Sequence, residues 1–195
     1  MFDIPIKKGF ISGTAREIQL TWDILRDIWD SCEKGAWSGE TGVSTGEQIL
    51  DLHVYKEFDW IVGQMIPHVI EYWDKDLGYC PAHIQPVASW ANLHIDGDFT
   101  QEHSHSAGIR QAHVASVFYL KKGEGGDIEF CDPLDHIRRF TPLAKSVDDA
   151  ILSQSMPCTT GDFLLFPGWL RHRTQPAIGK RVAISINFNG NFDYN

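Results

Sequence analysis

The sequence lacks the long apolar runs that cross a bilayer, which excludes a chain anchored by a transmembrane helix. Its first residues, Met1–Pro5, also lack the basic start and apolar centre of a signal peptide. With no visible targeting segment, we expect a cytoplasmic protein that does not act at a membrane.

Basic residues are scarce: 17 Lys and Arg face 26 Asp and Glu, so the net charge is −9. Surfaces that bind nucleic acid cluster Lys and Arg, so we expect no nucleic-acid partner. Cysteine pairs at zinc-binding spacing are also absent, because no Cys-x-x-Cys occurs. The four cysteines lie far apart and read as reduced core residues: Cys32, Cys80, Cys131 and Cys158.

Two stretches before residue 80 carry apolar side chains at helical spacing. Thr14 and Glu17 form the Thr-x-x-Glu pattern of a capping box, which predicts a helix over residues 14–32. A second apolar stripe runs from Phe58 to Trp73, and Pro67 is expected to kink or end that helix. The glycine-rich residues 33–48 between them are expected to form a loop, either a surface connection or a flap over a site.

From about residue 84 the pattern changes to short strands separated by turns. Strands are expected at residues 89–95, 113–120, 127–131, 161–167, 171–174 and 182–187, with a long charged loop at 133–152. Many short strands of this kind predict a β-sandwich or barrel. We therefore predict one domain, residues 1–195, in which residues 1–80 give helical support to a β core at residues 84–195.

Two histidines in this half, His103 and His105, lie two residues apart. On an extended backbone such side chains point to the same face, with Cα atoms about 6.6 Å apart. Two rings at that separation can share one metal ion at nitrogen–metal distances of about 2.0–2.1 Å. The pair on its own is a weak signal, because a His-x-His is more often a surface feature than a ligand pair.

Further motifs follow in order: Val117-Phe-Tyr-Leu120, Gly125-Gly-Asp-Ile-Glu-Phe130, Gly161-Asp-Phe-Leu-Leu-Phe166, His172 and Arg181. With His103-x-His105, this pattern resembles the Fe(II)/2-oxoglutarate-dependent oxygenases, in their prolyl-hydroxylase-like branch. It is most similar to a bacterial and phage subgroup that carries His-x-His. The resemblance covers about half of the chain and implies a mainly β, double-stranded β-helix of jelly-roll or cupin type. We expect the two N-terminal helices to pack on its outer sheet.

The resemblance also implies the cofactors, namely Fe(II), 2-oxoglutarate as co-substrate, and O2. His103, His105 and His172 would be the catalytic metal ligands. Arg181, nine residues after His172, would bind the far carboxylate of 2-oxoglutarate, and Tyr119 would join it. Candidates for the pocket wall are Asn92 and Asn187, with His113 a weaker candidate at its mouth, while Trp169 is interpreted as a packing residue.

His105 stands where the family usually has Asp. A third neutral imidazole leaves the iron site at about +2, whereas a carboxylate would bring it to about +1, so this site should favour a dianion such as 2-oxoglutarate. A literal His-x-Asp does occur at His94-Ile-Asp96, and Asp96 is thus an alternative ligand. It ranks second because His94 lies too far before the strand of Tyr119.

The implied activity is hydroxylation of a C–H bond in a small molecule or peptide, such as a prolyl side chain, with release of succinate and CO2. One alternative is a three-histidine cupin enzyme that does not use 2-oxoglutarate, since Gly97-x5-His103-x-His105 opens like a cupin motif. Another is an inactive metal-binding interaction module. The substrate and the oligomeric state cannot be predicted, because loops 33–48 and 133–152 match nothing interpretable.

Overall fold

The computed structural model describes residues 4–35, 41–78, 81–108, 111–135, 137 and 153–191. The strands are β1 (Lys7–Phe10), β2 (Val43–Ser44), β3 (His83–His94), β4 (Val114–Lys121), β5 (Ile128–Cys131), β6 (Ser153–Met156), β7 (Asp162–Pro167), β8 (His172–Thr174) and β9 (Arg181–Asn191). The α-helices are α1 (Ala15–Trp29) and α2 (Asp59–Glu71). Short helical turns are Thr45–Glu47, Leu52–Val54, Lys56–Phe58 and Tyr72–Asp76.

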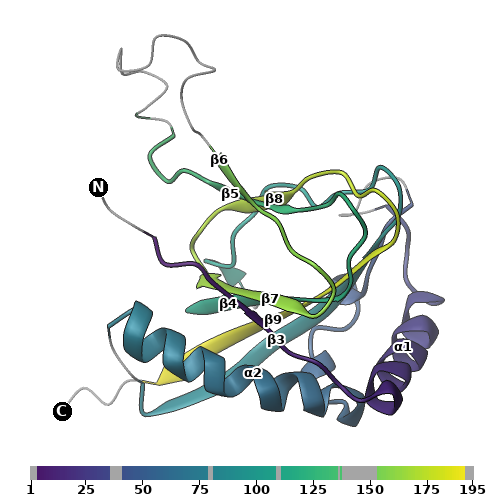
Figure 1. The fold of residues 1–195 in the computed structure, drawn as a ribbon, viewed down its shortest axis with the longest axis horizontal. Helices are drawn as coiled ribbons and strands as arrows, with labels where there is room; N and C mark the ends of the chain where they lie inside the picture. The colour runs from purple at the N-terminus through teal and green to yellow at the C-terminus, as the bar shows by residue number, and fades with distance from the viewer. Residues whose placement is uncertain are drawn as a thin grey trace.

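The strands form two antiparallel sheets. The larger sheet has the order β1-β7-β4-β9-β3-β2, and the smaller has the order β6-β5-β8. Figure 1 shows the two sheets one above the other, with α1 and α2 on the face of the larger sheet that points away from the smaller one. This arrangement is the predicted double-stranded β-helix with flanking helices.

The alternation of side chains along β9 separates the core from the space between the sheets. Val182, Ile184, Ile186 and Phe188 belong to the hydrophobic cluster that contains the side chains of both helices. Their neighbours Arg181, Ala183 and Ser185 line a cavity on the other face. Because successive side chains of a strand point to opposite faces, one strand serves both the core and the candidate site.

Helix α1 begins as predicted. Thr14 is its N-cap, and both hydrogen bonds of the capping box with Glu17 are present. The helix ends at Trp29, slightly before the predicted end at residue 32. The sequence predicts the start of α1 correctly because the capping box lies within four consecutive residues.

Pro67 was expected to kink or end helix α2, and the helix does not end there. It continues to Glu71 and into a π-helical turn, Tyr72–Asp76. Met65 and Val69, on either side of the proline, are both fully buried in the core shared with the larger sheet. Burial of apolar side chains on both sides of Pro67 outweighs the hydrogen bond that proline removes from a helix.

The loops differ from the prediction in two places. The glycine-rich segment 33–48 contains β2 and a helical turn, Thr45–Glu47, although residues 36–40 lie outside the described residues. Most of the predicted loop 133–152 also lies outside them, and β6 directly after it was not predicted. None of the helices in the described parts of the chain is long and apolar enough to cross a membrane.

Candidate metal centre

The backbone brings His172 to the His-x-His segment, although 67 or more positions of chain separate them. His103 and His172 form an isolated antiparallel bridge, in which each N–H donates to the carbonyl of the other at 2.9 Å. His105 N–H donates to the Gly168 carbonyl at 2.7 Å, just before β8. The segment 103–105 therefore lies beside the start of β8 as an added extended stretch.

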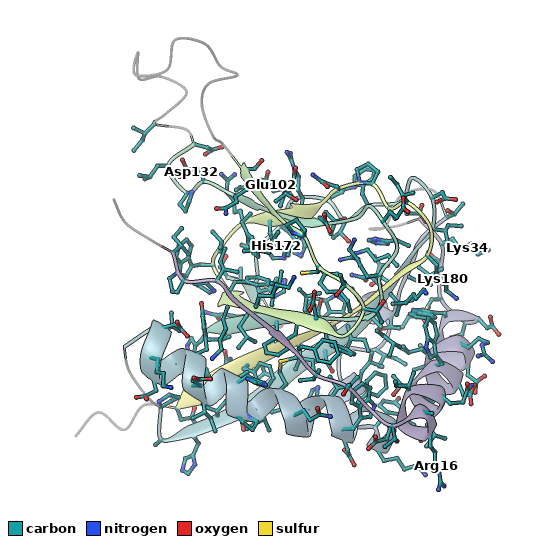
Figure 2. The ribbon with its side chains drawn as sticks, in the orientation of Figure 1. Arg16, Lys34, Glu102, Asp132, His172 and Lys180 are labelled. Atoms are coloured by element: carbon teal, nitrogen blue, oxygen red, sulfur yellow. The ribbon has the colours of Figure 1, made fainter. Side chains whose placement is uncertain are left out.

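The three imidazoles converge on one point. One nitrogen of each ring lies within 4.8 Å of the corresponding nitrogens of the other two. Figure 2 places His172 between the two sheets. This separation is comparable to twice a metal–imidazole bond of about 2.0–2.1 Å, so the group could hold one metal ion. It is the only such cluster of His, Cys, Asp or Glu within the described segments.

Each of the three rings donates a hydrogen bond from Nδ1 to an oxygen. His103 Nδ1 donates to the Gln101 carbonyl at 2.8 Å, and His172 Nδ1 donates to the Leu170 carbonyl at 2.9 Å. His105 Nδ1 lies 2.7 Å from Asn187 Oδ1. Because these oxygens accept, the proton of each ring sits on Nδ1 and the lone pair sits on Nε2, as a metal ligand requires.

The surroundings of His172 disfavour a charged imidazole. Burial, followed by the neighbouring His103 and His105, holds the pKa of His172 well below its usual range. The ring of Phe166 packs on His172 at 4.8 Å between centroids, and that of Trp90 packs on His105 at 5.3 Å. A neutral ring with an available lone pair is the form that binds a metal, so no proton must be removed first.

A cavity of about 420 Å³ opens beside the histidines. Its wall includes Asn92 and Arg181 from the larger sheet and Thr100 from the segment after β3. Ser44 and Glu47, from the glycine-rich segment 33–48, complete this part of the wall. This volume lies in the range of small-molecule sites, about 300–1,000 Å³. Part of the segment 33–48 thus walls the site.

The carboxylate of Asp98 anchors this wall segment. It accepts hydrogen bonds from the Thr41 hydroxyl at 2.9 Å and from the Ile95 N–H at 2.9 Å. Asp98 is 2% exposed, and these hydrogen bonds hold the pKa of its carboxyl below its usual range despite burial. The loop before β2 is therefore fixed to the turn after β3.

Arg181 is a buried cation in the cavity wall. It is 2% exposed, its Nη1 donates to His94 Nδ1 at 3.3 Å, and its Nε has no hydrogen-bond partner. None of the ion pairs between the described residues includes Arg181. A buried charge without a counter-ion is costly, so this guanidinium is arranged for an anionic ligand.

Two neighbours fix the Arg181 side chain. His94 is fully buried opposite it on β3, and burial lowers the pKa of His94 to about 3, with a further contribution from the Arg181 charge. Gly126 has a φ of +70°, and a Cβ built there would lie 2.8 Å from Arg181 Cδ. Glycine therefore gives the arginine stem the space that it occupies.

Tyr119 lies beside Arg181 as expected. The Arg181 Cζ atom is 5.2 Å from the centre of the Tyr119 ring, and the hydroxyl is buried without a hydrogen-bond partner. Burial raises the pKa of Tyr119 to about 12, although the Arg181 charge opposes that rise. The phenol stays protonated, and its O–H can donate to an anion bound at Arg181.

The residues of the site fit both ligands that the sequence analysis implied, iron(II) and 2-oxoglutarate. Three convergent Nε2 lone pairs suit a divalent transition metal, and open positions on such a metal are typical of non-haem iron sites. The orphaned Tyr119 hydroxyl and Arg181 Nε, both buried, suit a carboxylate that accepts several hydrogen bonds.

The structure places other candidates elsewhere. Asn187 lies against His105 rather than on the cavity wall. Asp96 is exposed, and its carboxylate accepts from the Gly179 N–H. The metal-binding group within the described residues therefore does not contain the alternative pair His94 and Asp96. His94 instead contacts Arg181 and Thr100.

Two expectations at the mouth are corrected. His113 and Trp169 line a separate hollow of about 360 Å³, outside the cavity of the histidines. His113 precedes β4, and its ring accepts from the Gly190 N–H and lies 6.3 Å from the Trp73 ring, which belongs to the core on the helix side. Trp169 is 52% exposed, so it packs less than expected.

Sequence reasoning missed Thr100, Ser44 and the role of His94. Thr100 Oγ1 lies 3.3 Å from His94 Nε2, and its N–H donates to Thr174 on β8. No local pattern marks these residues, because strand register and the fold of the glycine-rich segment bring them to the cavity. The alternation of β3 was the available signal, since Trp90, Asn92 and His94 share one face.

Residues 88–189 match a known family, described as "Putative 2OG-Fe(II) oxygenase". The chain belongs to this family. Its members are oxidoreductases that use iron(II), 2-oxoglutarate and O2. The matched segment contains the three histidines, Tyr119 and Arg181. No curated protein sequence matches the chain.

Solved structures share the fold at low sequence identity. A prolyl-4-hydroxylase from Pseudomonas putida is 15% identical, with a TM-score of 0.61 over 96% of this chain and 93% of that one. HygX from Streptomyces hygroscopicus, with nickel and 2-oxoglutarate bound, is 11% identical, with a TM-score of 0.65 over 98% and 85%. A prolyl hydroxylase from Trichoplax adhaerens, in complex with a peptide, is 13% identical, with a TM-score of 0.60 over 96% and 83%.

Proposed function

We propose that this oxygenase hydroxylates a C–H bond of a peptide or small molecule and oxidises 2-oxoglutarate in the same turnover. One atom of O2 enters the new hydroxyl group and the other enters succinate, while 2-oxoglutarate loses CO2. The observation that carries the proposal is that one cavity contains three convergent imidazoles and a buried arginine outside any ion pair between the described residues.

Different residues of the cavity would bind the metal and the co-substrate. His103, His105 and His172 would hold iron(II), which supplies the activation of O2 when bound. Arg181 would bind the far carboxylate of 2-oxoglutarate in a charge-assisted pair, and Tyr119 would donate a further hydrogen bond. The apolar walls from Trp90 and Phe166 would exclude water from the reacting groups.

Arg181 favours this function over a three-histidine cupin enzyme that does not use 2-oxoglutarate. Such an enzyme has no need for a buried guanidinium on the wall of its metal cavity. The spacing of nine residues between His172 and Arg181 is also that of the family. Use of 2-oxoglutarate is therefore the reading that gives each buried charged or titratable group of the cavity a role.

The substrate class is proposed by analogy. The Trichoplax structure holds a peptide, and a HygX structure holds hygromycin B, so the shared fold accepts both a peptide and a small molecule. Here Ser44, Glu47 and Asn92 line the cavity and would contact a substrate. A prolyl or other peptide side chain remains our first choice, because two of the three structural relatives described above are prolyl hydroxylases.

The proposal is tested by succinate release from 2-oxoglutarate with iron(II) and O2, in the presence of prolyl peptides and of aminoglycosides. We expect succinate only when both iron(II) and 2-oxoglutarate are present. Metal binding without succinate formation under any of these conditions would favour the inactive binding module. Substrate oxidation that is independent of 2-oxoglutarate would favour the cupin alternative.

A further inference from the structure

The Nδ1 acceptors of the three histidines are of two kinds. For His103 and His172 the acceptor is a backbone carbonyl two residues earlier, at Gln101 and Leu170. Each of these acceptors belongs to the same backbone segment as its histidine, so it does not depend on another side chain. For His105 the acceptor is the Asn187 side chain, 82 positions away in the sequence.

The local carbonyl that corresponds to these acceptors is engaged elsewhere in the case of His105. The carbonyl two residues before it belongs to His103, and that carbonyl already accepts the His172 N–H at 2.9 Å. The bridge that brings His172 to the site therefore already uses this oxygen once. The acceptor of the His105 Nδ1 proton lies instead on another strand, β9.

Asn187 is placed for this task. It is fully buried on β9 and lies opposite Ala88 of β3 and Ala115 of β4, whose small side chains leave room for an amide. Its Oδ1 is 2.7 Å from His105 Nδ1, a short distance for a neutral hydrogen bond. An amide oxygen accepts a hydrogen bond without adding charge to the site.

We propose that Asn187 is a positioning residue of the metal centre, which keeps the proton of His105 on Nδ1 and so makes Nε2 a ligand. The inference rests on the proposed function, since it assumes that the three histidines hold the metal. Without the amide, the ring would gain by moving its proton to Nε2 or by turning, and either change removes a ligand. The requirement is tied to histidine at position 105, because a carboxylate ligand there carries no N–H to satisfy.

The first test needs no metal. Ring nitrogen NMR of the metal-free protein reports which nitrogen of each histidine carries the proton. We expect Nδ1–H at all three ligands in the wild type. In Asn187→Leu, His105 should shift to Nε2–H or a mixture, while His103 and His172, with backbone acceptors, stay unchanged. An unchanged His105 tautomer in that variant would overturn the proposal.

The second test is a mutant cycle on metal affinity, measured by anaerobic titration with Fe(II). Loss of a partner that orients a metal ligand typically costs about 10–100-fold in affinity. We expect that loss for Asn187→Leu, retention within about threefold for Asn187→Asp, and no loss for the matched control Asn189→Leu, whose amide contacts the His113 backbone instead.

The same substitution is then repeated in the His105→Asp background. There Asn187→Leu should change Fe(II) affinity by less than about threefold, because no ring remains to be oriented. An equal loss in both backgrounds would show a purely structural role and contradict the proposal. If His105→Asp binds no Fe(II), the His105 tautomer in Asn187→Leu decides whether the proposal holds. If the wild type binds no Fe(II), the proposed function fails, but the tautomer measurement still tests the role of Asn187.

Discussion

The two ends of the cavity-facing side of β9 carry buried polar residues of different charge. At one end Arg181 is a buried cation whose described neighbours give it no carboxylate, so it is complete only with an anion. At the other end Asn187 is a buried neutral amide that orients a neutral ligand. Between them Ala183 and Ser185 are small and leave the cavity open. We therefore expect an anionic ligand to supply the charge that balances Arg181.

The largest expected effect is at the histidine end. His172→Ala removes the proposed ligand that β8 contributes, and leaves only His103 and His105. We expect no measurable binding of Fe(II) in anaerobic titration and no succinate formation. The fold should persist, since the backbone bridge between positions 103 and 172 does not need the ring. Retention of Fe(II) binding at wild-type affinity would mean that the metal lies elsewhere.

At the arginine end, Arg181→Ala should weaken 2-oxoglutarate without removing the metal. Hydrogen bonds to a charged group contribute about 1.5–3 kcal/mol each, so the affinity should fall by about 100-fold or more. Isothermal titration of the metal-loaded protein measures this. Fe(II) affinity in the absence of 2-oxoglutarate should stay within about threefold of the wild type. An unchanged 2-oxoglutarate affinity would refute the assigned role of Arg181.

His94 gives the arginine end a pH dependence. Its pKa in the folded protein is about 3, whereas the unfolded chain binds that proton near pH 6.5. The unfolded state therefore takes up the proton first as pH falls. The free energy of unfolding should decrease between about pH 6.5 and 3, by at most about 1.4 kcal/mol per pH unit from this group. Denaturant titrations of His94→Leu should show a shallower decrease; an identical slope would contradict the burial of a neutral ring.

The smallest effect is expected at Gly126. An alanine there would place its Cβ 2.8 Å from Arg181 Cδ, which is too close, so the arginine side chain has to shift. We expect the Kd for 2-oxoglutarate to rise about three- to tenfold with the Fe(II) affinity unchanged. Gly78→Ala is the matched control, since Gly78 also has a positive φ but no atom within 4 Å of the new Cβ. An equal effect in both variants would assign it to backbone strain alone.

Residues that belong to short sequence motifs could be predicted, whereas features that depend on packing could not. The three histidines and Arg181 line one cavity, and their roles as ligands stay predictions. They were singled out because each belongs to a short motif with a fixed spacing. The start of α1 was found for the same reason. The sequence left open whether α2 ends at Pro67, because its continuation depends on burial that only the packed sheet provides.

The supporting residues could not be predicted in the same way. Asn187 was expected on the pocket wall, and its contact with His105 depends on how the segment 103–105 lies over β9. His94 was considered as a metal ligand, but the register of β3 and β9 pairs it with Arg181. Contacts across strands that are distant in the sequence leave no local pattern, so only the assembled sheets reveal them.

The most direct measurement is a visible difference spectrum of the Fe(II)-loaded protein as 2-oxoglutarate is added without oxygen. The account predicts a charge-transfer band that saturates at one 2-oxoglutarate per chain, is absent in His172→Ala, and requires a much higher concentration in Arg181→Ala. A band of equal strength and midpoint in all three proteins, or no band in the wild type with iron bound, would contradict it.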